Sequence, residues 1–298
     1  MNTSASARVV AGVSGSPAGR RAVEAAAREA ERRNCPLHLA HTFNLLSDDA
    51  EDPRAAREVL SRAAVVAASV APDIRITTEL VEGHPLPSLL RLSRRAVLTV
   101  IGDGDLNDLT FMPREATAVQ LAARAFGSVL VTRAAPVPPG PVVAGLDDSL
   151  SAEAVLHYAF NAAAHRGSGL IVVHVSEAGS RTGDLDEVVA SRARKYGVDA
   201  RLRVLTGDPT AVMVRQSEQA SLIVVGARGR FPYRGLLGSV AQTMLHHGHA
   251  PVAIVRGTSP VLCRPSRTIP GPAERTRDKR VVSELLQPAA KAVRSLPS

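Results

Sequence analysis

The chain has 298 residues, of which 45% are apolar, and a formal net charge of +8, so it can bury a sizeable core. It has no tryptophan and only 3% aromatic residues, which argues against base-stacking platforms for single-stranded nucleic acid. No apolar run of about 18 residues and no signal-peptide pattern occur, and Cys35 and Cys263 lack the spacing of a metal or redox motif. We therefore expect a cytoplasmic protein with reduced cysteines and no membrane span.

Strands and helices are predicted to alternate along both halves of the chain. The first half opens with the strand VVAGV (9–13), continues through a glycine-bearing turn into a helix, and closes with the strand SVLVTR (128–133). The second half predicts, in order, PVVAGL (141–146), AEAVLHYAFNAAAH (152–165), LIVVHV (170–175), LDEVVASRARKYG (185–197), DARLRVL (199–205), PTAVMVRQSEQ (209–219), SLIVVG (221–226), SVAQTMLHHG (239–248) and PVAIVR (251–256).

The two halves are related by an internal repeat. The segment EGHPLPSLLRLSRRAVLTVIG (82–102) aligns without a gap to TGDPTAVMVRQSEQASLIVVG (206–226), 124 residues later. A period of this length indicates duplication of a whole domain. We predict a first domain over 1–135, a proline-rich linker over 136–141 within AAPVPPGP, a second domain over 142–256, and a disordered tail over 257–298. The tail carries eight basic and three acidic residues, and we expect it to be solvated rather than bound to nucleic acid or anionic lipid.

The fold class follows from the character of the strands. LIVVHV and SLIVVG are almost continuously apolar, which is typical of parallel strands covered by helices on both faces. Right-handed crossovers then predict two doubly wound, mainly parallel five-stranded α/β sheets of Rossmann-like type. Ligands of such sheets lie beyond the carboxyl ends of the strands, where the strand order switches.

The stretch VVGARGRFPYRGLLGS (224–239) lies at that edge and joins a strand to a helix. Its glycines allow backbone N–H groups to approach a phosphate, and Arg228 and Arg230 add positive charge. Ser239 could act as a helix N-cap or as a donor to an anion. The glycine spacing alone is equally compatible with a sharp strand-to-helix turn. Neither a P-loop nor a complete dinucleotide fingerprint is present.

Together, GARGRFPYRGLLGS, the strand ends VAGLDDS and VVHVSE, and the closing HAPVAIVR resemble the universal stress protein family, in tandem over residues 8–256. The family's loop is G-x-x-G, nine residues, then G-[ST]; here eight residues separate Gly229 from Gly238-Ser239. The resemblance implies a nonenzymatic protein with an adenine-nucleotide α-hydrolase-like fold that binds ATP, accompanied by Mg²⁺. By analogy, adenine and ribose would contact Gly145, Leu146, Asp147 and Val175, and the phosphates would contact Gly226, Arg228, Gly229, Arg230, Gly238, Ser239 and Val240.

The first copy departs from this pattern. Ser14 stands in place of Asp147, Asp105 in place of Gly229, and Ala116-Thr117 in place of the Gly-Ser pair. Asp103, Asp105 and Asp108 would then lie near the phosphate position and repel a triphosphate. We interpret the first copy as a degenerate partner that keeps the fold without the nucleotide.

Several polar residues have simpler interpretations than catalysis or metal binding. His246, His247 and His249 are expected to lie near the end of a helix rather than to share a metal, and Asp148-Ser149 is expected to cap a helix rather than to form a catalytic carboxylate pair. No catalytic or metal-binding residue is therefore predicted.

The predicted function is ATP-dependent regulation of stability or partner binding in a stress response. The alternatives are an ATP-hydrolysing enzyme of the same superfamily and a nucleotide-free scaffold. In the resembled family the last strand of each domain lies at a sheet edge and pairs antiparallel with another domain. The resemblance therefore implies that the apolar strands VLVTR and VAIVR pair with each other and pack the two domains as a pseudo-twofold pair. A homodimer would then use another surface, and the protein partner cannot be named from the sequence.

Overall fold

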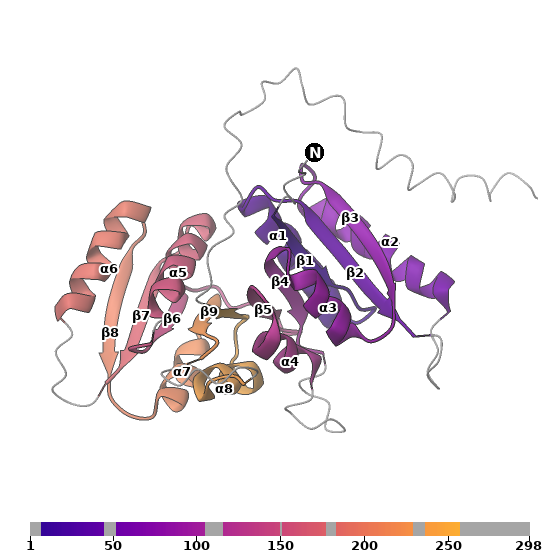
Figure 1. Cartoon of the computed structure of the whole chain (residues 1–298). Helices are drawn as coiled ribbons and strands as arrows, with labels where there is room; N and C mark the ends of the chain where they lie inside the picture. Colours follow the sequence, from indigo (N-terminus) through magenta and orange to yellow (C-terminus); the bar gives the residue numbers. More distant parts are fainter. Residues whose placement is uncertain are drawn as a thin grey trace, which may run out of the picture. The chain divides into compact units, whose positions relative to one another are not determined.

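The computed structural model describes residues 7–44, 52–104, 116–149, 151–176, 183–228 and 236–256. The predicted tail, 257–298, lies outside the described residues. The first half contains β1 (Arg8–Gly12), α1 (Pro17–Arg32), β2 (Leu37–Phe43), α2 (Pro53–Val70), β3 (Ile76–Glu82), α3 (Pro85–Ser93), β4 (Ala96–Gly102), α4 (Thr117–Arg124) and β5 (Ser128–Thr132) (Figure 1). The second half contains β6 (Val142–Leu146), α5 (Ala152–Arg166), β7 (Leu170–Val175), α6 (Gly183–Tyr196), β8 (Ala200–Leu205), α7 (Pro209–Ser217), β9 (Leu222–Gly226), α8 (Ser239–His247) and β10 (Val252–Val255). The predicted alternation of strands and helices is confirmed.

Repeated sequence produces repeated local structure at the starts of α3 and α7. Gly83 and Gly207 occupy equivalent positions of the repeat, and both have positive φ, at 115° and 122°. A proline follows in the first turn of each helix, where its missing N–H costs no hydrogen bond. Asp208 also caps α7 by accepting a hydrogen bond from the Ala211 N–H at 2.8 Å.

The strands form one ten-stranded sheet in the order β3-β2-β1-β4-β5-β10-β9-β6-β7-β8. Neighbouring strands are parallel within each half, and β5 and β10 join the halves in antiparallel register, with Leu130 opposite Ala253. This junction confirms the predicted pairing of VLVTR with VAIVR. It also explains why both edges can be strongly apolar, since each covers the hydrogen-bonding groups of the other.

Two apolar layers cover the sheet. One layer packs α1, α2, α5 and α6 against alternate strand residues, and the other packs α3, α4, α7 and α8 against the opposite face (Figure 1). On β5, for example, Leu130 belongs to the first layer, whereas Val129 and Val131 belong to the second. Alanine and valine dominate both layers, which allows the helices to lie close to the strands.

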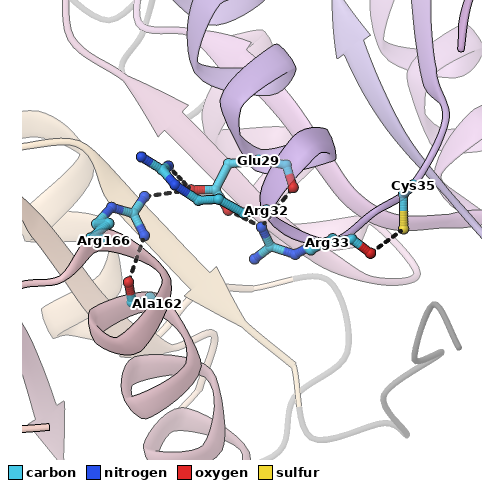
Figure 2. Close-up of polar contacts among 6 residues, drawn as sticks. All are labelled: Glu29, Arg32, Arg33, Cys35, Ala162 and Arg166. Carbon is cyan, nitrogen blue, oxygen red and sulfur yellow. Dashed lines mark hydrogen bonds and ion pairs between the residues drawn. The ribbon is translucent and has the colours of Figure 1, made fainter. Parts of the chain in front are cut away.

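A buried ion-pair cluster also joins the halves. Glu29 of α1 is only 1% exposed and contacts Arg32, Arg33 and, across the junction, Arg166 of α5 (Figure 2). Burial of this carboxylate would be costly without the guanidinium groups around it.

Figure 2 also shows Cys35, whose sulfur lies 3.4 Å from the carbonyl oxygen of Arg33. Cys35 is disulfide-bonded, contrary to the expectation of reduced cysteines, and Cys263 lies outside the described residues.

Candidate functional site

The candidate site lies at the carboxyl ends of β6, β7 and β9. In the sheet, β6 stands between β9 and β7 and is parallel to both. The chain passes from β6 through α5 to β7 on one side, while β9 flanks β6 on the other. The switch in strand order therefore falls between β6 and β9, the position at which doubly wound sheets bind ligands.

The first wall of the site is the turn after β6. A Cβ atom on Gly145 would lie 3.0 Å from Met213 Cε and 3.1 Å from Met213 Sδ, so close packing of α7 against β6 favours glycine here. The Leu146 side chain is buried in the core, and its carbonyl oxygen lies 3.3 Å from His174 Nδ1. Leu146 therefore exposes little surface to a ligand. Asp147 is exposed, and its Oδ1 accepts a hydrogen bond from the Ser149 N–H at 3.2 Å. Asp147 thus places an exposed carboxylate directly after β6.

The second wall begins at the end of β9 and is tied to the first by Ser151. The Ser151 hydroxyl donates to the carbonyl oxygen of Arg228 at 3.2 Å and lies 2.7 Å from the Ser149 hydroxyl. A Cβ atom on Gly226 would lie 2.7 Å from Ser151 Oγ, so a larger residue here would displace the Ser151 hydroxyl from its present position. Ser151, rather than Asp148-Ser149, is the N-cap residue of α5, and its side chain makes no capping hydrogen bond. The expected N-cap position was therefore wrong, although the Ser149 hydroxyl accepts a hydrogen bond from the Ser151 N–H at 3.3 Å.

The glycine loop is closed at its base by backbone hydrogen bonds. Ala227 N–H donates to Val255 O at 2.8 Å, and Gly238 N–H donates to Ala227 O at 3.0 Å. The start of α8 is thereby held beside the end of β9, with Gly238 as its N-cap and Ser239 as its first residue. Of the two roles considered for Ser239, the N-cap position belongs instead to Gly238, one residue earlier, and the role as a donor to an anion stays a prediction. The first N–H groups of α8 remain a suitable anion-binding element.

Two arginines give the site its charge. Arg228 follows β9, and Arg256 follows β10, whose Val255 pairs with Gly226. Arg256 donates from Nη2 to the carbonyl oxygen of Ala122 in α4 at 2.6 Å. The Nε atoms of both arginines are buried and have no hydrogen-bond partner among the described residues. Burial, and then the neighbouring charge of Arg228, lowers the pKa of Arg256 to about 10. This pair of cations therefore favours a bound anion.

In the first half, a carboxylate stands at the strand end that is equivalent to the end of β9. Asp103 occupies the position of Ala227, directly after β4, and Arg133 occupies the position of Arg256, directly after β5. The Arg133 and Asp103 side chains approach to 3.8 Å, and Asp103 is only 4% exposed. Burial raises the pKa of Asp103, while the charge of Arg133 opposes that rise. The buried arginine of the first half thus has its counter-ion inside the protein.

Arg133 also links the halves. Its guanidinium donates to the carbonyl oxygens of Met244, Leu245 and Ala250, at and just beyond the end of α8. This arrangement mirrors the bond from Arg256 to α4. A cation at the carboxyl end of a helix neutralises its unpaired carbonyl groups.

The predicted site residues are divided among several positions. Gly145, Leu146 and Asp147 end β6 and begin the next turn, Val175 ends the neighbouring β7, Gly226 and Arg228 end β9 and begin the next turn, and Gly238, Ser239 and Val240 begin α8. Val175 and Val240 are partly buried against the core. Gly229 and Arg230 lie outside the described residues, as do Asp105 and Asp108. Sequence reasoning missed Ser151 and Arg256, although Arg256 stands directly after a predicted strand at this edge.

The histidines near α8 do not form a metal site in the described part of the chain, where no group of three or more His, Cys, Asp or Glu residues has that geometry. His246 and His247 lie in the last turn of α8, as predicted. His249 follows the helix, where its backbone N–H donates to the Ser217 hydroxyl at 3.0 Å. Searching the same residues finds no helix that is long and apolar enough to cross a membrane.

Comparison with known proteins agrees with this architecture. The sequence matches the universal stress protein family over residues 6–133 and 181–256. Universal stress protein Rv1996 of Mycobacterium tuberculosis (strain ATCC 25618 / H37Rv) is 27% identical over 302 residues, covering 83% of this chain and 94% of that protein. Universal stress protein Mb2028c of Mycobacterium bovis is 29% identical over 286 residues, covering 83% and 96%.

Among solved structures, a universal stress protein from Archaeoglobus fulgidus DSM 4304 has a similar fold. It superposes with a TM-score of 0.64 at 17% identity and covers 86% of this chain and 98% of its own. The fold likeness, the two matched stretches and the full-length relatives agree with the tandem organisation of the sheet. The chain belongs to the universal stress protein family.

Proposed function

We propose that this chain is a nucleotide-dependent regulatory protein of the stress response that binds one adenine nucleotide, ATP, in its second half. The nucleotide would lie across the carboxyl ends of β6, β7 and β9. Asp147 would accept a hydrogen bond from the ribose, and the start of α8 with the glycine loop would hold the phosphates. Mg²⁺ would enter with the phosphates. Occupancy of the site would alter the stability of the protein or its affinity for a partner.

The single observation that carries the proposal is the difference in charge between the two equivalent strand ends. In the second half, Arg228 and Arg256 share no carboxylate partner in the described structure. In the first half, Asp103 faces Arg133. An anion would therefore be attracted to the second site, whereas at the first it would have to displace a buried carboxylate.

The proposal includes the domain division into 1–135, 136–141 and 142–256 and a cytoplasmic location. It assigns no catalytic residue: His174 lies 3.3 Å from the Leu146 carbonyl oxygen, and Asp147 accepts the Ser149 N–H, so neither side chain is aligned with a bound water or substrate in the described structure. An enzyme that hydrolyses ATP would need a base aligned with an attacking water. A nucleotide-free scaffold is the other alternative, and the same experiment distinguishes it.

Mass spectrometry of nucleotide released from the purified full-length protein tests the proposal. ATP is the expected nucleotide. Release of ADP alone, with turnover of added ATP, would favour the enzyme, and absence of any nucleotide together with no binding would favour the scaffold.

Two substitutions test the assigned roles. Asp147→Ala removes a charge-assisted hydrogen bond worth about 1.5–3 kcal/mol, and we expect ATP binding to weaken by about 10- to 150-fold. Gly238→Val should weaken binding further, because the added side chain obstructs the approach of phosphate to the start of α8. A folded Gly238→Val protein with unchanged affinity would mean that the loop serves only as a turn.

A further inference from the structure

The first half carries a basic cleft that shares no residue with the candidate nucleotide site. The cleft has a volume of about 430 Å³ and is lined by Pro87, Leu90, Arg91, Arg94, Arg124 and Phe126, and we call it the arginine cleft. Its walls are α3, the end of α4 and the turns that precede β4 and β5. These turns lie at the amino ends of the first-half strands, and the candidate nucleotide site lies at the carboxyl ends of the second-half strands. Because β5 and β10 are antiparallel, both sites lie at the same edge of the sheet, but they are formed by different residues.

The apolar part of the cleft is an exposed aromatic ring held in place. Phe126 is 51% exposed, in a chain with only 3% aromatic residues. Its backbone N–H donates to the Ser93 hydroxyl at 3.2 Å, and the Arg94 guanidinium lies 4.2 Å from the ring centroid. The stacking fixes both side chains and leaves the donors of Arg94 at the rim. Leu90 and Pro87 extend this apolar surface.

The rim of the cleft has an excess of positive charge. Arg91 pairs with Glu79 at 2.7 Å, and Arg124 donates to the neutral Gln120 amide at 3.1 Å. Within the described structure, neither Arg94 nor Arg124 forms an ion pair with a carboxylate. Such a rim attracts acidic groups and repels basic ones.

The second half shows that the fold does not require this surface. In the repeat, Glu218 occupies the position of Arg94, and Val214 occupies that of Leu90. The charge at the Arg94 position is thus reversed in the second half, although Arg215 keeps the charge of Arg91. The combination of Arg94 with Leu90 is not repeated.

We propose that the arginine cleft is a docking site for an acidic segment of a partner protein that inserts an apolar side chain against Phe126. The charge of the rim selects carboxylates, and the exposed ring and Leu90 accept the apolar group. An open, shallow cleft suits an extended peptide, which can place acidic residues on both sides of its apolar anchor. A single exposed aromatic ring offers less to nucleic acid, whose successive bases need a series of stacking surfaces.

Fluorescence anisotropy with the full-length protein tests this proposal. The probe is a fluorescein-labelled peptide in which a Leu-Phe pair is flanked on both sides by runs of Asp and Glu. Arg94→Glu introduces the charge found in the second half, and we expect it to raise the Kd by about tenfold or more. Phe126→Ser should weaken binding through loss of the apolar contact. Arg57→Glu, on the exposed face of α2, is the matched control for net charge and should leave the Kd nearly unchanged.

The peptides and a competitor complete the test. A probe with Gln and Asn in place of the acidic residues should not bind, and one with Ser in place of Leu-Phe should bind weakly. The proposal is wrong if Arg57→Glu weakens binding as much as Arg94→Glu, if the neutral probe binds equally well, or if no acidic probe binds. It is also wrong if a single-stranded RNA oligonucleotide occupies the cleft more tightly than the peptide. Retained ATP affinity in Arg94→Glu would confirm that the two sites are separate.

Discussion

Ala227→Asp should convert the second site into a copy of the first. Ala227 is only 4% exposed and directly follows β9, at the position that Asp103 holds after β4. In the first half, the carboxylate lies 3.8 Å from the guanidinium of Arg133. At that distance, two unit charges attract by about 4 kcal/mol in an effective dielectric of about 20. The introduced carboxylate would therefore compete with a phosphate for Arg256.

The expected loss of ATP affinity equals the free energy of the hydrogen bond between the phosphate and Arg256 that the introduced carboxylate would replace. A charge-assisted hydrogen bond contributes about 1.5–3 kcal/mol, so the Kd for ATP should rise by about 10- to 150-fold. Isothermal titration calorimetry of the full-length variant measures this change. Ala227→Asn has nearly the same bulk without the charge, and it should bind ATP much more tightly than Ala227→Asp. The reasoning is refuted if both variants weaken binding equally, or if a folded Ala227→Asp protein binds like wild type.

Three further predictions concern the stability and assembly of the chain. Glu29→Gln leaves three arginines without their shared carboxylate and should lower the free energy of unfolding by about 3–5 kcal/mol, whereas Glu58→Gln, in an exposed pair, should cost at most about 1 kcal/mol by urea denaturation. Burial, and then the charge of Arg8, lowers the pKa of His38 below 6.5, so between the folded and unfolded pKa values the unfolded chain binds more protons than the folded one. The thermal midpoint should therefore fall as the pH drops below 6.5, and His38→Gln should reduce this fall. The fragment 142–256 should self-associate through the exposed β10 edge, and a folded monomer at high concentration in sedimentation experiments would contradict the importance of the β5–β10 junction.

Much of the fold could be predicted because its signals are local and repeated. LIVVHV and SLIVVG identified buried parallel strands, and the alignment of 82–102 with 206–226 identified the duplication. The pairing of VLVTR with VAIVR was expected from the family resemblance, together with the need to cover two apolar edges. These inferences depend on continuous apolar runs, which have few alternative placements in a globular fold.

The polar details could not be predicted in the same way. Asp148, Ser149 and Ser151 are all common helix-capping residues, so the pattern does not show which residue caps α5 and which bonds the glycine loop. The roles of Arg133 and Arg256 depend on the antiparallel junction, which brings each side chain to a helix of the other half. Such contacts join residues more than a hundred positions apart in the sequence, and only the register of β5 and β10 determines them.

Calorimetric titration of the full-length protein, freed of bound nucleotide, with ATP tests the central claim most directly. One ATP per chain is expected, because the buried arginine of the second half lacks the carboxylate that Asp103 provides in the first. Two equivalent sites per chain would contradict the assignment of the first half as empty. A protein that binds no nucleotide would contradict the proposed function as a whole.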